Sequence, residues 1–269
     1  MTAVVTLAAD QYPAGTRHTP HQHDTVQLSI VLAGRVAETV GRVTEQASAL
    51  SVVCKAAGVM HADQFGPAGA RLARLTLPHG VLAPLLDDPQ RATEWRWTHD
   101  PTVAMPFLRL IGRAAQQPCT VAPDDADFLD LLAAFTARPA RQARGHPPAW
   151  LDRTIRDLAV SWTSQHGVGD VARHAGVHPV YLARCVRRWY GISVGNMLRE
   201  LRLRTAVAHS IDGDHSVSHA AHAAGYADES HFNRAMHAAT GLTPGRYRAL
   251  VRTLEFTVRR HGPTGGLPR

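Results

Sequence analysis

The stretch GYADESHFNR, residues 225–234, decides how the second half of this 269-residue chain folds. An alanine-rich helical pattern ends at Gly225, and helical spacing resumes a few residues later. Glycine readily adopts the left-handed backbone that closes a helix, so Gly225 marks a turn between two helices. The pattern therefore predicts a helix-turn-helix motif, whose second, recognition helix covers residues 228–239.

The same pattern occurs 49 residues earlier, which makes the motif an internal repeat. VARHAGV (171–177) matches AAHAAGY (220–226), and the offset becomes 50 beyond the glycine. We therefore expect a first motif with its recognition helix at 179–190. A long helix over 194–211 would separate the two copies. It would hold the recognition helices at a fixed spacing, as successive major grooves about 34 Å apart require.

The net positive charge of the chain lies entirely in its second part. Residues 150–269 contain 16 arginines and 9 acidic residues, and this difference accounts for the whole net charge of +7. Residues 1–149 are electrically balanced. The planar guanidinium group of arginine fits phosphates and the edge of guanine. A neutral part joined to a basic part indicates two tasks, one of which involves a polyanion.

The repeat resembles the signature of the AraC family of transcription regulators. GYADESHFNR is followed by TGLTPGRYR (240–248), and the resemblance covers roughly residues 150–252. Members of this family join a variable sensing domain to a DNA-binding domain with two helix-turn-helix motifs. The resemblance implies a regulator rather than an enzyme, with double-stranded DNA and RNA polymerase as partners.

Roles in DNA binding are carried over by position onto the recognition helices. Arg184 and Arg234 are equivalent in the two copies and are expected to contact guanine or an adjacent phosphate. Glu229 either caps its helix or accepts a hydrogen bond from cytosine. Val180 and Ala183 are apolar, so they either contact the methyl group of a thymine or make no contact with a base. The expected DNA-contacting set is Val180, Ala183, Arg184, Arg187, Arg188, Glu229, Ser230, Asn233, Arg234 and Arg248, with Arg187, Arg188 and Arg248 at phosphates.

The first part of the chain, to about residue 85, is typical of short strands separated by turns, which predicts a β-barrel or sandwich. Two amphipathic helices follow, over 101–117 and 124–137. They either close this domain or pair with a second subunit as a homodimer. Glycines at positions 34, 41, 58, 66 and 69 provide the turn signals.

A second, weaker resemblance lies in this first part. His21, His23 and Gln27, in GTRHTPHQHDTVQLSIVLAG (15–34), have the spacing of the first cupin motif. Gln27 stands where enzymes of that fold usually carry glutamate. AAGVMH (56–61) is similar to the second cupin motif. The resemblance implies a small barrel with an internal pocket.

Strand geometry explains how these side chains would meet. His21 and His23 are two residues apart, so on a strand their side chains point to one face. Gln27 lies an even number of residues from both, and His61 reaches in from a neighbouring strand. Such a set could hold Zn²⁺, Ni²⁺, Mn²⁺ or Fe²⁺. His18 is expected in a loop, outside this pocket.

Three interpretations of the pocket stay open. It is the site of a metal-dependent cupin enzyme, a sensory pocket that contains a metal ion, or a sensory pocket whose histidines bind a small molecule without metal. No cofactor follows with certainty. Because of the basic repeat, the main hypothesis is a regulator that senses a small molecule or a metal ion and binds DNA.

The expected organisation is α+β with two domains. A cupin-like barrel with flanking helices covers 1–137, a Pro- and Arg-rich linker 138–149, an all-α DNA-binding domain 150–255, and a disordered tail 256–269. Three distant cysteines are typical of free thiols in a reducing cytoplasm. No apolar run approaches the ~18–20 residues of a membrane helix.

Overall fold

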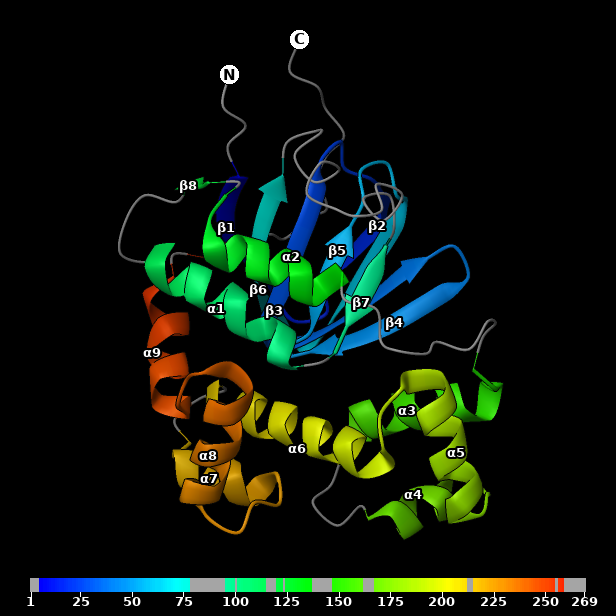
Figure 1. Ribbon diagram of the computed structural model, residues 1–269. Helices are drawn as coiled ribbons and strands as arrows, with labels where there is room; N and C mark the ends of the chain where they lie inside the picture. Colours follow the sequence, from blue (N-terminus) through cyan, green and yellow to red (C-terminus); the bar gives the residue numbers. More distant parts are fainter. Residues whose placement is uncertain are drawn as a thin grey trace. The chain divides into compact units, whose positions relative to one another are not determined.

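The computed structural model describes residues 5–77, 95–99, 101–114, 120–122, 124–136, 147–161, 167–211, 215–254 and 256–258. The chain divides into two compact units, Met1–Thr136 with Ala239–Arg269, and Ala137–Ala238. The first unit is built on a sheet and the second is helical (Figure 1), which confirms the expected two-domain α+β class. None of the described helices is long and apolar enough to cross a membrane.

The first unit contains a nine-stranded sheet among its described residues. The strands are β1 (Val5–Tyr12), β2 (Arg17–His21), β3 (Val26–Val40), β4 (Val43–Ser48), β5 (Val52–Lys55), β6 (His61–Leu77), β7 (Arg96–Thr98), β8 (Thr120–Val121) and β9 (Thr257–Val258). Their order is β7-β5-β3-β6-β1-β8, while β2 pairs with β6, β4 with β3, and β9 with β1. Only the β9–β1 pairing is parallel among these strands.

β3 and β6 are long because each of them runs through two parts of the sheet. The first half of β3 pairs with β5 and the end of β6, whereas its last residues pair with β4 and the start of β6. Register shifts around Ala33 and Gly34 bend β3 between these two parts. Gly34 has a φ of +78°, and a Cβ atom there would collide with the carbonyl oxygen of Gly69, so only glycine fits the bend.

These bends correct the expectation that the glycines of this region mark turns between short strands. Gly41 and Gly58 lie in turns, but Gly34 lies within β3, and Gly66 and Gly69 lie within β6. Glycine favours a bulge as well as a turn, so its spacing alone does not distinguish a bent strand from two short ones. β3 and β6 are therefore longer than the short strands that the sequence predicts.

Two helices, α1 (Pro101–Ala114) and α2 (Ala126–Thr136), follow the main strands and lie across one face of the sheet (Figure 1). Both helices were expected from their amphipathic pattern. Their apolar stripes are buried within the single chain, with Phe107, Ile111 and Phe128 fully inaccessible to solvent. This burial supports the expectation that the two helices close the domain.

The C-terminal segment also belongs to the first unit. Tyr247 of α9 (Pro244–Thr253) is fully buried, and its hydroxyl hydrogen-bonds the carbonyl oxygen of Leu32 on β3. β9 pairs with Asp10 and Gln11 of β1, so the segment expected to be disordered from residue 256 begins instead with a strand. This pairing is made by the backbone and requires no side-chain pattern. Residues 259–269 lie outside the described residues.

The second unit contains the two helix-turn-helix motifs. Its helices are α3 (Ala149–Ser161), α4 (Val168–His174), α5 (Pro179–Tyr190), α6 (Val194–Ile211), α7 (Val217–Ala223) and α8 (Glu229–Thr240), whose last two residues group with the first unit. The predicted recognition helices are α5 and α8, and α6 is the predicted long helix. Most of the predicted linker, 138–146, lies outside the described residues.

The two motifs repeat in geometry as well as in sequence. Gly176 and Gly225 both have left-handed backbones, with φ of +67° and +86°. The residue after each glycine donates a backbone hydrogen bond across the turn, which closes the preceding helix. These bonds join Val177 to Ala172 at 3.0 Å and Tyr226 to Ala221 at 2.9 Å. The alanines are buried, as expected where two helices approach closely.

Candidate effector site and nucleic-acid interface

Three histidines meet at one end of the sheet. His21 is the last residue of β2 and pairs in register with His61, the first residue of β6, while His23 follows β2 in the connecting segment. The rings of His21 and His61 are 4.3 Å apart between centroids, and His23 is 5.1 Å from each of them. One ligand nitrogen from each histidine lies within 4.8 Å of the others, which is close enough for a shared ion.

Backbone carbonyls orient two of these rings. The Nδ1 atom of His21 lies 2.9 Å from the carbonyl oxygen of Thr19, and that of His61 lies 2.9 Å from the carbonyl oxygen of Val59. A carbonyl oxygen only accepts, so Nδ1 carries a proton in both rings, and Nε2 is the nitrogen that can bind a metal. The Nε2 atom of His61 is buried and has no hydrogen-bond partner among the described residues.

The environment keeps two of the three histidines, His23 and His61, uncharged. Burial, together with the neighbouring His61 and Lys55, lowers the pKa of His23 from 6.5 to about 3. Burial and the Lys55 ammonium group also lower the pKa of His61. Both rings are therefore neutral at pH 7 and present lone pairs rather than positive charge, as metal ligands do.

A buried ion-pair network lies next to the histidines. The Nζ atom of Lys55 is 2.5 Å from Glu38 Oε1 and 3.5 Å from Asp63 Oδ1. Glu38 is fully buried, and its Oε2 atom accepts 2.6 Å hydrogen bonds from the indole N–H groups of Trp95 and Trp97. Burial opposes ionisation of Asp63, but the Lys55 charge holds the pKa of that carboxyl below its usual range.

This network was not expected from the sequence. Lys55 is the only lysine in the chain, although 28 arginines are present, and it follows three apolar residues of β5. The available signal for this network was a single lysine at the end of a buried strand, in a chain that otherwise uses arginine. Glu38 and Asp63 have no such signal, because only the pairing of β3 with β6 brings them together.

His18 corrects a second expectation, since it lies in β2 rather than in a loop. It is buried, and its Nδ1 atom lies 3.4 Å from Asp63 Oδ2. Simple alternation would place His18 and His21 on opposite faces. A register shift between the two residues brings both to the Asp63 side, where His21 Nε2 is 3.9 Å from the same oxygen.

Gln27, the fourth residue of the expected pocket, lies on β3 directly opposite Lys55 of β5. Directly opposed residues of antiparallel strands share a face, so Gln27 faces the side on which Lys55 pairs with Glu38 and Asp63. Its side chain is buried. The structure thus brings His21, His23 and His61 into contact and places Gln27 on the same face of the sheet as Lys55.

The recognition helix α5 separates its residues into a buried and an exposed face. Leu182, Cys185 and Val186 are buried, whereas Val180 is 52% exposed. Tyr181, which is not among the expected contact residues, is 48% exposed and lies beside Trp150. The remaining predicted contact residues of this helix are all exposed: Ala183, Arg184, Arg187 and Arg188.

The recognition helix α8 presents a comparable face. Its cap is Asp228, whose Oδ1 atom accepts a 2.6 Å hydrogen bond from the amide of His231, so Glu229 does not have that role. Glu229, Ser230 and Arg234 are exposed, and Asn233 is half-buried. Arg248 is half-buried on α9, in the first unit.

Two family models match the chain and cover both sites. The AraC-like ligand binding domain matches residues 4–131, which contain the histidine cluster, and a helix-turn-helix domain matches residues 171–250, which contain both recognition helices. The chain belongs to the AraC family of transcription regulators. This AraC-family protein is therefore a DNA-binding regulator with an N-terminal ligand-binding domain, and its matched domains are those of a regulator rather than an enzyme.

Several solved structures are similar to this AraC-family chain. The C-terminal domain of AraT, a response regulator from Geobacillus stearothermophilus, is 24% identical over 39% of this chain and 88% of its own, with a TM-score of 0.36. ToxT from Vibrio cholerae is 8% identical over 92% of this chain and 98% of its own, with a TM-score of 0.37. An AraC-type regulator from Chromobacterium violaceum is 22% identical over 37% and 89%, with a TM-score of 0.35.

Proposed function

We propose that this AraC-family regulator responds to a divalent transition metal bound by His21, His23 and His61. The observation that carries the proposal is the Nε2 atom of His61, which is buried without a hydrogen-bond partner among the described residues and lies next to two further imidazoles. A buried polar atom without a partner costs about 1–3 kcal/mol, and coordination of a metal would remove that cost. Hydrogen bonds from Nδ1 to backbone carbonyls are typical of metal-binding histidines.

Two other groups of side chains compete for an ion, and the Lys55 charge disfavours both. One is His18, His21 and Asp63, and the other is Glu38, His61 and Asp63. Each contains a carboxylate that already pairs with the Lys55 ammonium group, so a divalent cation there would face a fixed positive charge. The three-histidine set contains no carboxylate and binds through neutral lone pairs.

Imidazole ligands favour some metals over others. Nitrogen donors suit Zn²⁺, Ni²⁺ and Fe²⁺, whereas Mn²⁺ prefers carboxylate and carbonyl oxygens. Zn²⁺, Ni²⁺ and Fe²⁺ are therefore the favoured ions. Gln27, on the same face of the sheet as Lys55, is a further oxygen donor. A bound ion would supply a Lewis-acid centre to which an anionic effector could also attach.

The alternative is a pocket that binds a small polar effector without metal. Its support is that the same Nε2 lone pairs would accept hydrogen bonds from hydroxyl or amide groups. In both versions the regulated output is DNA binding by α5 and α8, and RNA polymerase is the partner in transcription. A homodimer through α1 and α2 would use their polar outer faces, because their apolar stripes are buried within one chain.

Metal binding by the full-length chain, purified without a histidine tag, tests the proposal. We expect stoichiometric metal by mass spectrometry, or calorimetric binding of Zn²⁺ or Ni²⁺ to the metal-free protein. His61→Ala and His23→Ala should each weaken binding by about 100-fold or more, because each removes one of three ligands. His18→Gln is the matched control, since it alters the neighbouring group and leaves the three ligands in place.

The outcomes separate the alternatives. Loss of binding in His18→Gln with retention in His23→Ala would move the ion to the His18, His21 and Asp63 group. Absence of metal after incubation with each of the four candidate ions would refute the metal version and leave the metal-free pocket. Operator binding measured with and without the ion reports whether the metal is also the regulatory signal.

A further inference from the structure

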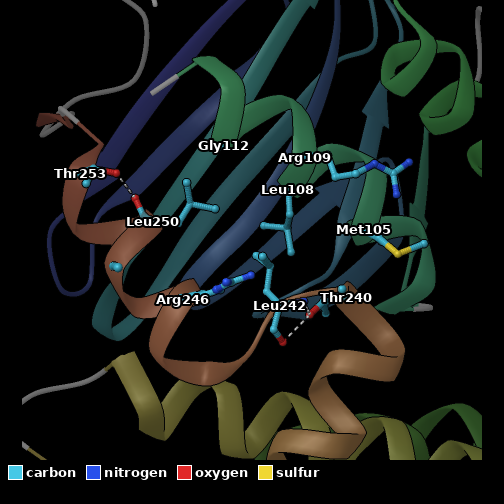
Figure 2. A pocket seen from close by; sticks show the side chains of 11 residues that line it. Met105, Leu108, Arg109, Gly112, Thr240, Leu242, Arg246, Leu250 and Thr253 are labelled. Atoms are coloured by element: carbon cyan, nitrogen blue, oxygen red, sulfur yellow. Dashed lines mark hydrogen bonds between the residues drawn. The ribbon is translucent and has the colours of Figure 1, made fainter. Parts of the chain in front are cut away.

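A groove between α1 and α9 forms a second candidate site (Figure 2). All of its lining residues belong to the first unit, and none belongs to the histidine cluster. Its volume is about 430 Å³, within the range of sites that bind small organic molecules. Met105 and Leu108 of α1, together with Leu242 and Leu250, give it an apolar lining.

The two arginines of the groove have different roles. Arg109 of α1 forms ion pairs with Asp127 at 2.5 Å and Asp130 at 3.0 Å, so α2 neutralises its charge. Figure 2 shows its guanidinium group turned away from Leu108 and Leu242. Arg246 of α9 is directed into the groove and is exposed. Its guanidinium group has no acidic partner among the described residues.

Gly112 of α1 leaves part of the groove open. A Cβ atom at this position would meet no heavy atom within 4 Å, although Gly112 lines the groove. Glycine within a helix costs about 1 kcal/mol relative to alanine. The open volume at Gly112 is therefore available to a ligand, and a larger side chain there would fill it.

We propose that this groove binds a small organic anion with an apolar body, whose acidic group pairs with Arg246. The apolar lining accommodates the body, and Arg246 is the exposed cation that complements the charge. The site is additional to the proposed metal site and does not depend on it. Because a guanidinium–carboxylate pair is charge-assisted, the groove should distinguish an acid from its neutral amide.

The position of the groove also predicts an effect on DNA binding. Its lining includes Thr240, the last residue of the recognition helix α8, and the turn Gly241–Leu242, which directly follows that helix. The Thr240 side chain is buried and accepts a 3.2 Å hydrogen bond from the amide of Leu242. An occupant would contact α1 and this turn together, so it should alter the affinity of the full-length chain for its operator.

Calorimetric titration of the full-length chain tests the proposal with two acid–amide pairs. The probes are indole-3-acetate and 4-phenylbutyrate, each compared with its neutral amide. At least one acid should bind about tenfold more tightly than its amide. Arg246→Gln should abolish that preference and leave the affinity for the amide unchanged. Gly112→Phe should remove binding, whereas the control Gly112→Ala should preserve it.

Three results would overturn the proposal. The first is that neither acid binds, and the second is that acid and amide bind equally. The third is binding that persists in Gly112→Phe but disappears in His61→Ala, which would place the probe at the histidine cluster. Circular dichroism verifies that Gly112→Phe is folded. If Gly112→Phe is not folded, Arg246→Gln alone still tests the proposal, because this exposed side chain can be replaced without loss of the fold.

Discussion

The hydroxyl of Tyr247 donates a 2.7 Å hydrogen bond to the carbonyl oxygen of Leu32, 215 residues earlier in the chain. The carbonyl is available because β3 bulges there: Val31 and Ala33 pair with β6, but Leu32 has no partner in that register. Burial raises the pKa of the Tyr247 hydroxyl, so it remains a donor at any physiological pH. A bulge in the ligand-binding domain thus anchors the helix that follows the second recognition helix.

Removal of this hydroxyl should destabilise the first unit. Tyr247→Phe leaves a buried carbonyl without its partner, which costs roughly 1–2 kcal/mol of unfolding free energy. Tyr247→Ala should cost more, roughly 3–5 kcal/mol, because it also leaves a cavity. Urea unfolding followed by circular dichroism measures both variants. A Tyr247→Phe variant as stable as the parent would show that water replaces the hydroxyl at no cost.

Loss of Lys55 should be more damaging than loss of a typical surface lysine. Lys55→Met would leave Glu38 and Asp63 buried without their cation, at a cost of roughly 3–5 kcal/mol. The double variant Lys55→Met with Glu38→Gln should recover part of that loss, because one uncompensated charge is removed. Thermal unfolding of both variants and the parent provides the comparison. A double variant less stable than Lys55→Met would contradict this electrostatic explanation.

The recognition helices should differ from the rest of the basic domain in their effect on DNA binding. Arg234→Ala should cost about 1–3 kcal/mol of operator binding and relax the preference at one base pair. Arg199, an exposed arginine on α6 outside both recognition helices, is the matched control. Arg199→Ala should leave base preference unchanged. Selection from a randomised DNA library, followed by affinity measurement at two salt concentrations, tests both variants.

The N-terminus of α2 should show a dependence on pH. Asp125 caps this helix by accepting from the amides of Asp127 and Phe128 at 3.0 and 3.2 Å, and it pairs with Arg113 at 2.6 Å. Burial opposes ionisation of Asp125, but these partners lower its pKa below 3.8. Because the folded pKa is depressed, its stabilising effect is present above pH 3.8 and is lost as the pH falls through the lower folded value.

Two variants separate the cap from the charge. Asp125→Asn keeps a capping oxygen and should flatten the acid limb of the stability profile. Asp125→Ala should in addition cost about 1 kcal/mol at neutral pH, because the cap is lost. Unfolding free energies measured from pH 2 to 7 distinguish the variants. An unchanged acid limb in Asp125→Asn would assign the pH dependence to other carboxylates.

Local signals predict the helical unit well. The bounds of α5 and α6 agree with the sequence expectation, because a proline, a serine or a glycine marks each end. The repeat, the left-handed glycines and the basic charge all lie close to the residues that they affect. A helix forms through contacts between near neighbours in sequence, and therefore its bounds can be predicted from a short window.

The sheet domain depends on long-range pairing that such a window does not contain. Sequence spacing identified His21, His23 and His61. It left out His18, which was expected in a loop but lies in β2, where a register shift brings it to Asp63. The pairing of β3 with β6 likewise brings Glu38 and Asp63 together beside Lys55.

The sequence by itself determined the family, the two helix-turn-helix motifs and three members of the histidine cluster. Only the tertiary structure decided that α9 is anchored to β3, that a buried ion-pair network adjoins the histidines and that a groove opens between α1 and α9. The physical reason is that helix signals act over a few residues. Strand register, bulges and buried ion pairs depend on residues that are distant in the chain.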